Sequence, residues 1–463
     1  MTKANTKWRK MTKKCLLHFF IIMSKNERLF REFRLMLCLN ILFLKSMKFF
    51  YLFYLVLCLL FAGCTHPAKN VESSDILVED SGIQEIAVIE NISKSQKMYL
   101  STIASNIEYC MLETDKKCLV TPSMSIYCSN EYIVTIGIQS VNHEVCYVFN
   151  RKTGKFVRQI SRMGQGPNEF LETIDSFWDT ENEQVCVWSH PYYIFYNIDG
   201  TISHKINRNE HRFFSRGAIS FNDYYVKYVP NSSGNETKRI VFLDRNGVVI
   251  DSISNFRTWE KTQRAYAGSH LGSFHVYGNE LYYADIYCDT LYHIQDFNLQ
   301  PRYVFNTGGH TLPYQVHDGA GRYNIMEILK SNELVDHWKE YFVLDKMFED
   351  ARHLYFTFDY RTKRYPAIYN KKEEILQILP PVIITLPSKY SKMLLYGFEN
   401  DLDGGLPFWP RQMISENEMM CVYTAEELLE LDISKITHEK LKNVLNYLKE
   451  DSNPVVAIVT LKD

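Results

Sequence analysis

The sequence predicts an all-β fold, a six-bladed β-propeller with short helical insertions, on three observations. Tyr, Phe and Trp make up 14% of the 463 residues, and aromatic side chains favour strands because they pack well on a pleated, half-buried surface. Hairpin patterns recur along the chain, with the turn glycines Gly154, Gly200 and Gly247 spaced 46 and 47 residues apart. Single strand patterns without a partner stand at the two ends of the same region.

Each hairpin pattern has an alternating apolar segment, a polar turn and a second alternating segment. Clear copies cover 146–160, 193–206 and 240–253, and weaker copies cover 291–305 and 367–378. A glycine suits these turns because they need a residue at positive φ. Strand hairpins that recur every ~40–50 residues are typical of propeller blades. An antiparallel sandwich with coincidental spacing is the alternative.

The two ends of the region supply the sixth blade. Residues 107–114 form a strand with no preceding partner, and 453–463 form a strand with no following partner. Pairing them would close the ring and leave no exposed sheet edge. We therefore expect one propeller domain over 97–463, with six blades.

Two segments interrupt the strand pattern and predict short helices. Residues 321–342 carry apolar side chains at helical spacing, and 424–449 begin with Thr424 followed three positions later by Glu427. A Thr with a Glu three residues on is the capping-box signature of a helix start.

The first residues of the chain predict an export signal rather than a domain. Residues 47–63 combine a basic start, a short apolar run and small residues before Cys64, which is the layout of a signal peptide. The ending Ala62-Gly63-Cys64 is similar to a bacterial lipobox, so we expect Cys64 to be lipidated and to begin the mature protein. An uncleaved anchor and a plain secreted protein are the alternatives.

The segments before and after this signal also have an interpretation. Residues 1–46 contain 11 Lys or Arg, and the simplest account is an over-long reading frame with translation starting at Met47. An unusually long basic start of the signal is the alternative. The polar segment 64–96 is expected to be a flexible tether.

The charge of the chain argues against nucleic-acid binding. Residues 1–63 hold 12 basic and two acidic residues, which leaves 40 basic against 52 acidic residues in 64–463. Nucleic-acid binding needs clustered Lys and Arg to neutralise phosphates, and the sequence after residue 64 shows no such cluster.

The cysteines after Cys64 are expected to be buried free thiols that act as small apolar side chains. Their number is odd and no CxxC spacing occurs, which argues against a zinc site and a disulfide framework. A single Cys110–Cys118 disulfide is the alternative. The seven are Cys110, Cys118, Cys128, Cys146, Cys186, Cys288 and Cys421.

The stretch RMGQGPNEF at 162–170 resembles a phosphate loop only superficially. A dinucleotide-binding loop opens a helix after a strand, whereas Gly164 and Gly166 follow the second strand of a hairpin and precede Pro167. We expect a tight connection between blades, with Phe170 packing into the next blade.

A family resemblance agrees with this architecture. The segments at 103–114, 154–170, 288–294, 406–413 and 453–462 are similar, in this order, to segments of the six-bladed β-propeller lipoproteins of gut-type Gram-negative bacteria, and more distantly to NHL repeats. The resemblance covers 97–463. It implies a fold and an envelope location, and it implies no reaction.

The sequence offers few candidate catalytic or metal-binding residues. The acidic segment 399–410 lacks the ligand spacing of a hand-type calcium loop, and His310 and His317 are too far apart for a zinc pair. Neither a catalytic residue, nor a metal site, nor a cofactor is expected. Glu108, Asp175 and Asp285 are acids whose place relative to the channel cannot be read from spacing.

The expected function is a binding or scaffolding module held by the Cys64 lipid in the outer membrane, on its periplasmic or surface face. Its ligand would be a glycan, a peptide or a partner protein, with Trp409 as an aromatic contact at the rim. The alternative is a metal-dependent hydrolase or lyase of the lactonase kind. Three or four inward-facing acids, amides or histidines at one channel mouth would favour this alternative.

Overall fold

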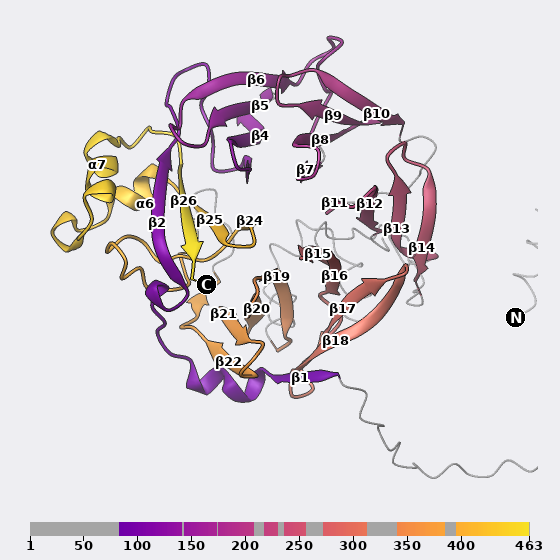
Figure 1. Ribbon diagram of the computed structural model, residues 1–463, viewed down its shortest axis with the longest axis vertical. Coiled ribbons are helices and arrows are strands. Elements are labelled where there is room, and N and C mark those ends of the chain that lie inside the picture. The colour runs from indigo at the N-terminus through magenta and orange to yellow at the C-terminus, as the bar shows by residue number, and fades with distance from the viewer. Residues whose placement is uncertain are drawn as a thin grey trace, which may run out of the picture. The chain divides into compact units, whose positions relative to one another are not determined.

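The computed structural model describes residues 83–140, 143–173, 175–207, 217–229, 236–255, 272–312, 340–384 and 395–462. Within these ranges the strands form six sheets arranged as a ring, so the predicted six-bladed β-propeller is confirmed (Figure 1). The expected signal at 1–63, Cys64 and the helix over 321–342 lie outside the described residues or extend beyond them.

Each blade runs from an inner strand at the ring centre to an outer strand at the rim (Figure 1). Blade 1 contains β3 (Ser125–Cys128), β4 (Tyr132–Ser140), β5 (His143–Asn150) and β6 (Phe156–Arg162). Blade 2 contains β7 (Asp175–Asp179), β8 (Gln184–Ser189), β9 (Tyr192–Asn197) and β10 (Ile202–Asn207). Blade 3 contains β11 (Ile219–Phe221), β12 (Tyr224–Tyr228), β13 (Lys238–Asp244) and β14 (Val249–Ser254).

The other three blades follow the same plan with additions. Blade 4 contains β15 (Gly272–Tyr277), β16 (Glu280–Asp285), β17 (Thr290–Gln295) and β18 (Asn298–Asn306). Blade 5 contains β19 (Val343–Glu349), β20 (His353–Tyr360), β21 (Lys363–Asn370) and β22 (Ile375–Ile378), and β23 (Val382–Ile383) also pairs with β21. Blade 6 contains β24 (Gln412–Ser415), β25 (Glu418–Tyr423), β26 (Val455–Leu461) and β2 (Ala104–Met111).

The five predicted hairpins are the outer two strands of blades 1 to 5. The turn glycines Gly154, Gly200 and Gly247 have φ of +68°, +88° and +84°. Glycine adopts this left-handed region without steric cost. In the weaker copies non-glycine residues take the same conformation, namely Asp296, Phe297 and Glu374.

Ring closure also follows the prediction. Strand β2 pairs antiparallel with β26 over seven registered positions, from Ala104 opposite Leu461 to Met111 opposite Val455. Strand β2 is thus the outer strand of the blade that contains β26, the last strand of the propeller.

The expected tether boundary at residue 96 is wrong. Strand β1 (Gln84–Ala87) pairs in parallel with the outer strand β18, and the 3₁₀ helix η1 (Ile89–Lys94) lies beside β22. The chain from 84 to 103, here called the strap, then reaches blade 6, where the Leu100 amide donates to the Glu399 carbonyl at 2.8 Å. Ile86 and Val88 are buried between blades 4 and 5. Pattern analysis missed the strap because its partners lie two hundred or more residues later in the chain.

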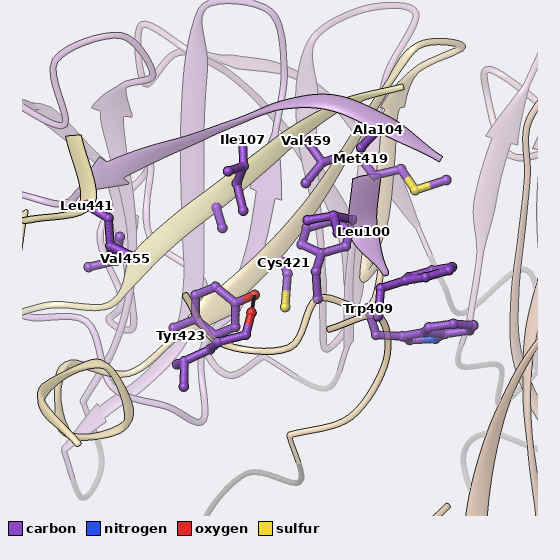
Figure 2. Close-up of a cluster of buried hydrophobic side chains, with 14 of the residues drawn as sticks. Leu100, Ala104, Ile107, Trp409, Met419, Cys421, Tyr423, Leu441, Val455 and Val459 are labelled. Atoms are coloured by element: carbon purple, nitrogen blue, oxygen red, sulfur yellow. Dashed lines mark hydrogen bonds between the residues drawn. The ribbon is translucent and has the colours of Figure 1, made fainter. Parts of the chain in front are cut away.

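Short helices lie against the outside of blade 6 (Figure 1). The helices are α6 (Ala425–Leu429), η4 (Ile433–Lys435) and α7 (Glu439–Tyr447). The predicted capping box starts α6, because Thr424 Oγ1 accepts from the Glu427 amide and the Glu427 carboxylate accepts from the Thr424 amide. Leu441 of α7 is fully buried against Val455 and its neighbours (Figure 2).

All seven cysteines of the propeller are buried and free, as expected. Burial raises the pKa of the Cys110 thiol to about 11 and that of Cys128 to about 12. These thiols stay protonated near neutral pH and pack as apolar groups. Among the described residues, no helix is both long and apolar enough to cross a membrane.

Ring closure yields a first prediction. Removing 453–463 takes β26 from the middle of blade 6, so β2 loses its partner strand and β25 keeps only β24. The truncated protein should therefore melt far below the full chain and aggregate. Thermal unfolding and size-exclusion chromatography measure this. The control Tyr447→Ser changes a residue with 74% exposure on the neighbouring α7 and should leave melting unchanged. A truncated chain that melts like the full one would refute closure by β26.

Candidate functional site

A pocket of about 450 Å³ lies where the inner strands of blades 3 to 6 approach the ring centre. This volume falls within the roughly 300–1,000 Å³ range of small-molecule sites. Its apolar lining includes Ile219, Phe274, Ile286 and Phe348. Its charged lining consists of Asp285, Asp345, Lys346 and Arg411. Four blades therefore contribute to a single cavity.

Both carboxylates of the pocket are already neutralised by arginines. Asp285 is buried, forms an ion pair with Arg239 and accepts from the Tyr283 hydroxyl at 3.1 Å. Asp345 Oδ2 lies 3.1 Å from Arg364 Nη2. Arg364 also holds Asp359 through two hydrogen bonds of 2.8 and 3.0 Å. These acids thus form part of the framework of the pocket.

The two other charged groups have no such neutralisation. Across the described residues, neither the Lys346 ammonium nor the Arg411 guanidinium makes a hydrogen bond or ion pair. Enclosure by the surrounding blades lowers the pKa of Lys346; Asp345 opposes this shift, whereas Arg411 and Arg364 add to it. The side chain of Lys346 is exposed to solvent and lines the pocket. Lys346 is therefore an ammonium held in an unfavourable electrostatic environment.

A β-bulge places Lys346 in the pocket. The register between β19 and β20 shifts between Leu344 and Met347, which leaves Asp345 and Lys346 without a paired position. A bulge re-aims side chains and often occurs beside functional sites. Met347 resumes the alternation as a buried side chain. Sequence analysis missed Lys346, although two adjacent charges inside an apolar strand pattern were a visible signal.

The donors of the pocket do not fit a divalent cation. Asp285 and Asp345 are engaged by arginines, and Lys346 and Arg411 would repel a metal ion. No group of three or more His, Cys, Asp and Glu with metal-binding geometry occurs in the part of the chain that the structure describes.

Trp409 does not form an aromatic rim, and the expectation that it contacts a ligand is wrong. Its side chain is only 5% exposed. The indole stacks on Phe398 with ring centroids 5.7 Å apart and meets Tyr355 edge-on at 6.2 Å. It packs within the apolar cluster at the base of blade 6 (Figure 2). A buried indole cannot stack on a sugar.

Gly164 and Gly166 lie in the connection from β6 to β7. A Cβ on Gly164 would come within 2.0 Å of the Glu169 carboxylate. That carboxylate accepts from the Gly166 amide at 2.8 Å and binds Arg162 Nε at 2.8 Å. The glycines therefore make room for an internal carboxylate, and neither has a positive φ. Phe170 is buried between blades 1 and 2.

The acidic segment 399–410 belongs to the framework of the fold. The carboxylate of Asp401 accepts from the Ser101 amide at 2.9 Å, which fastens the strap. Asp403 is buried and accepts from the Gly405 amide at 2.9 Å.

The remaining candidate residues do not gather at one site. Glu108 is exposed and lies 3.2 Å from Lys440, and Asp175 Oδ2 accepts from the Gly217 amide at 2.8 Å. His310 Nδ1 lies 2.9 Å from the Glu340 carbonyl oxygen, and His317 is outside the described residues. Of the acids considered from sequence, Asp285 is part of the pocket lining.

The match to a known family covers the whole propeller. A family model for a domain of unknown function, DUF4934, matches residues 83–460. The chain belongs to the DUF4934 family. The start of this match coincides with the strap and not with residue 97.

A solved structure shares the fold of this DUF4934 domain. A putative exported protein from Bacteroides fragilis superimposes with a TM-score of 0.58 at 17% identity, covering 82% of this chain and 100% of the other. A member of the DUF4221 family from Bacteroides vulgatus gives a TM-score of 0.45 at 13% identity, covering 78% and 97%. No curated protein matches the chain.

A buried ionic cluster between blades 4 and 5 holds two of the pocket-forming blades of the DUF4934 domain together. Glu349, at the end of β19, has a fully buried side chain. It accepts two hydrogen bonds of 2.8 Å from Arg302 and one of 2.8 Å from Lys371. His275 Nε2 lies 3.3 Å from the same carboxylate. Burial alone would raise the pKa of Glu349, but His275 and Arg302 outweigh it and lower the pKa to about 2.

This cluster makes the stability of the fold depend on pH in the acidic range. Because the folded-state pKa lies below the ordinary 4.5, the ionised carboxylate stabilises the fold above pH ~4.5, and this contribution is lost as the pH falls to about 2. Glu349→Gln should cost about 3 kcal/mol at neutral pH, since it leaves buried cations without their counter-charge. Urea unfolding of both proteins across this pH range measures the difference.

The control is Glu373→Gln, an exposed carboxylate on the turn after β21, which should have no measurable effect. A Glu349→Gln difference that persists unchanged at pH 2 would contradict the assignment.

Proposed function

We propose that the protein is a lipid-anchored binding module of the cell envelope, with its ligand held in the pocket at the ring centre. The observation that carries the proposal is the single cavity of about 450 Å³ formed by four blades. Its size suits a small molecule or the end of a glycan or peptide.

The sequence before the propeller supports an envelope location. Residues 47–64 have the layout of a lipoprotein signal, and the structurally similar Bacteroides fragilis protein is described as a putative exported protein. Lipidation at Cys64, anchoring in the outer membrane, and membership of the NHL-like lipoproteins belong to this proposal.

The pocket favours binding over metal-dependent hydrolysis. The hydrolase or lyase alternative needs several free oxygen or nitrogen donors turned toward one point. Here the two carboxylates of the pocket are ion-paired to arginines and two further cations stand beside them. No observation favours the enzyme.

Anchoring can be tested on the native protein. The Cys64→Ala precursor should remain unprocessed and leave the membrane fraction, whereas the natural chain should yield no peptide from residues 1–63 by mass spectrometry. Intact peptides from 1–46 would show that translation starts upstream of Met47.

Pocket binding can be tested by blocking the cavity. Ser273→Trp places an indole in the lining of the pocket. This change should lower the affinity for any ligand found in glycan and peptide screens by at least about tenfold, because the bulky ring excludes the ligand from the cavity. The control Ser254→Trp carries the same change on an exposed residue of the outer strand β14. A lactonase and esterase panel runs in parallel, with and without calcium or zinc, and EDTA-sensitive turnover would replace the binding proposal with the enzyme.

A further inference from the structure

The charged side chains in and around the pocket carry an excess of positive charge. Lys346, Arg364 and Arg411 meet Asp345 and Asp359 at the junction of blades 5 and 6. The remaining carboxylate of the pocket, Asp285, is matched by Arg239. With Arg239, Arg364 and Asp359 counted as the partners of the lining carboxylates and of one another, this leaves one formal positive charge around the cavity. Residues 64–463 as a whole carry 12 more acidic than basic groups.

The fold does not require this excess of positive charge. Arg364 is held by two carboxylates and connects β19 with β20 and β21. Lys346 and Arg411 do not connect strands or blades, because their side chains make no hydrogen bond or ion pair in the described ranges. The side chain of Lys346 is exposed to the pocket, yet its pKa is lowered, so the ammonium is less favourable there than in water. A ligand with a negative charge would favour the ammonium.

We propose that the pocket recognises an anionic group, a carboxylate or a phosphate, on a small ligand, and that Lys346 and Arg411 bind this group. Arginine and lysine are the side chains that bind such anions through charge-assisted hydrogen bonds. The apolar residues Phe274, Ile286 and Phe348 line the same cavity and contact the body of the ligand. The inference rests on the proposed binding function and names its ligand class.

The test measures binding of three probes to the whole propeller by titration calorimetry. Glucuronate carries a carboxylate, glucose is its neutral counterpart, and inorganic phosphate is the second anion. Glucuronate or phosphate should bind and glucose should not, and the anion that binds identifies the group. Lys346→Met and Arg411→Met should each weaken binding by about tenfold or more, the effect of losing a hydrogen bond to a charged group.

Two further variants separate binding from folding. Lys346→Arg keeps the charge and should retain most of the affinity. Lys372→Met removes an exposed lysine on the outer hairpin of the same blade and should bind like the natural protein. Without a ligand, Lys346→Met should melt at the same temperature or higher, since it removes a charge that forms no ion pair and whose pKa is lowered. Replacing a structural lysine would lower the melting temperature.

The pH dependence gives an independent readout. Asp345, Arg364 and Arg411 are the charged groups that face Lys346. Glucuronate affinity should fall as the pH rises through the pKa of Lys346, which lies below the ordinary 10.5, because only the protonated amine binds an anion. The same titration of Lys346→Met should lack this fall.

The outcomes distinguish this inference from the proposed function. Equal binding of glucose and glucuronate, or full affinity in Lys346→Met, overturns the anion site. The same holds if none of the three probes binds. A screened ligand that Ser273→Trp blocks and Lys346→Met spares would overturn the anion site while pocket binding stands. Loss of binding in Lys346→Met with rescue by Lys346→Arg supports both.

Discussion

The pairing of β2 with β26 is the constraint on which the rest of the propeller depends. Each blade has two apolar faces and can bury them only between neighbours, so an open ring would expose the faces at its break. Because the outer strand of blade 6 comes from the start of the chain, the last blade cannot separate without breaking backbone hydrogen bonds. The pocket depends on this closure as well, since Lys346 belongs to blade 5 and Arg411 precedes the inner strand of blade 6.

A repeated ionic device joins the blades inside the closed ring. A basic residue directly after the third strand of blades 1, 3 and 5 donates to a carbonyl of the inner turn of its own blade. The same residue binds a carboxylate: Arg151 binds Glu418 of blade 6, Arg245 binds Asp179 of blade 2, and Lys371 binds Glu349, which Arg302 of blade 4 also holds. The junction at Lys346 departs from this device, because each cation of the three joints binds a carboxylate, whereas Lys346 and Arg411 make no ion pair within the described residues.

The parts of this structure that sequence analysis predicted are those that local patterns specify. Alternation and turn glycines such as Gly154 define the hairpins, and two single strands define the closure. The strap was not predicted because β1 pairs in parallel with a strand far along the chain. A parallel edge strand has no adjacent hairpin turn that would indicate the pairing in the sequence. Trp409 was misplaced because a residue type does not reveal its exposure. The pocket could not be predicted, since Asp285, Lys346 and Arg411 meet only when inner strands of different blades converge.

Closure across the length of the chain also ties folding to complete synthesis. Ser105 in β2 donates to the carbonyl of Thr460, 355 residues later in the sequence. A chain is made from its N-terminus, so the strap and β2 emerge first and wait for partners that are translated last. Contacts of such long sequence separation form slowly. Any chain that is stalled, clipped or missing its final strand keeps β2 as an unpaired edge, which proteases of the cell can attack. The closed ring therefore forms only from a chain that still has its final strand.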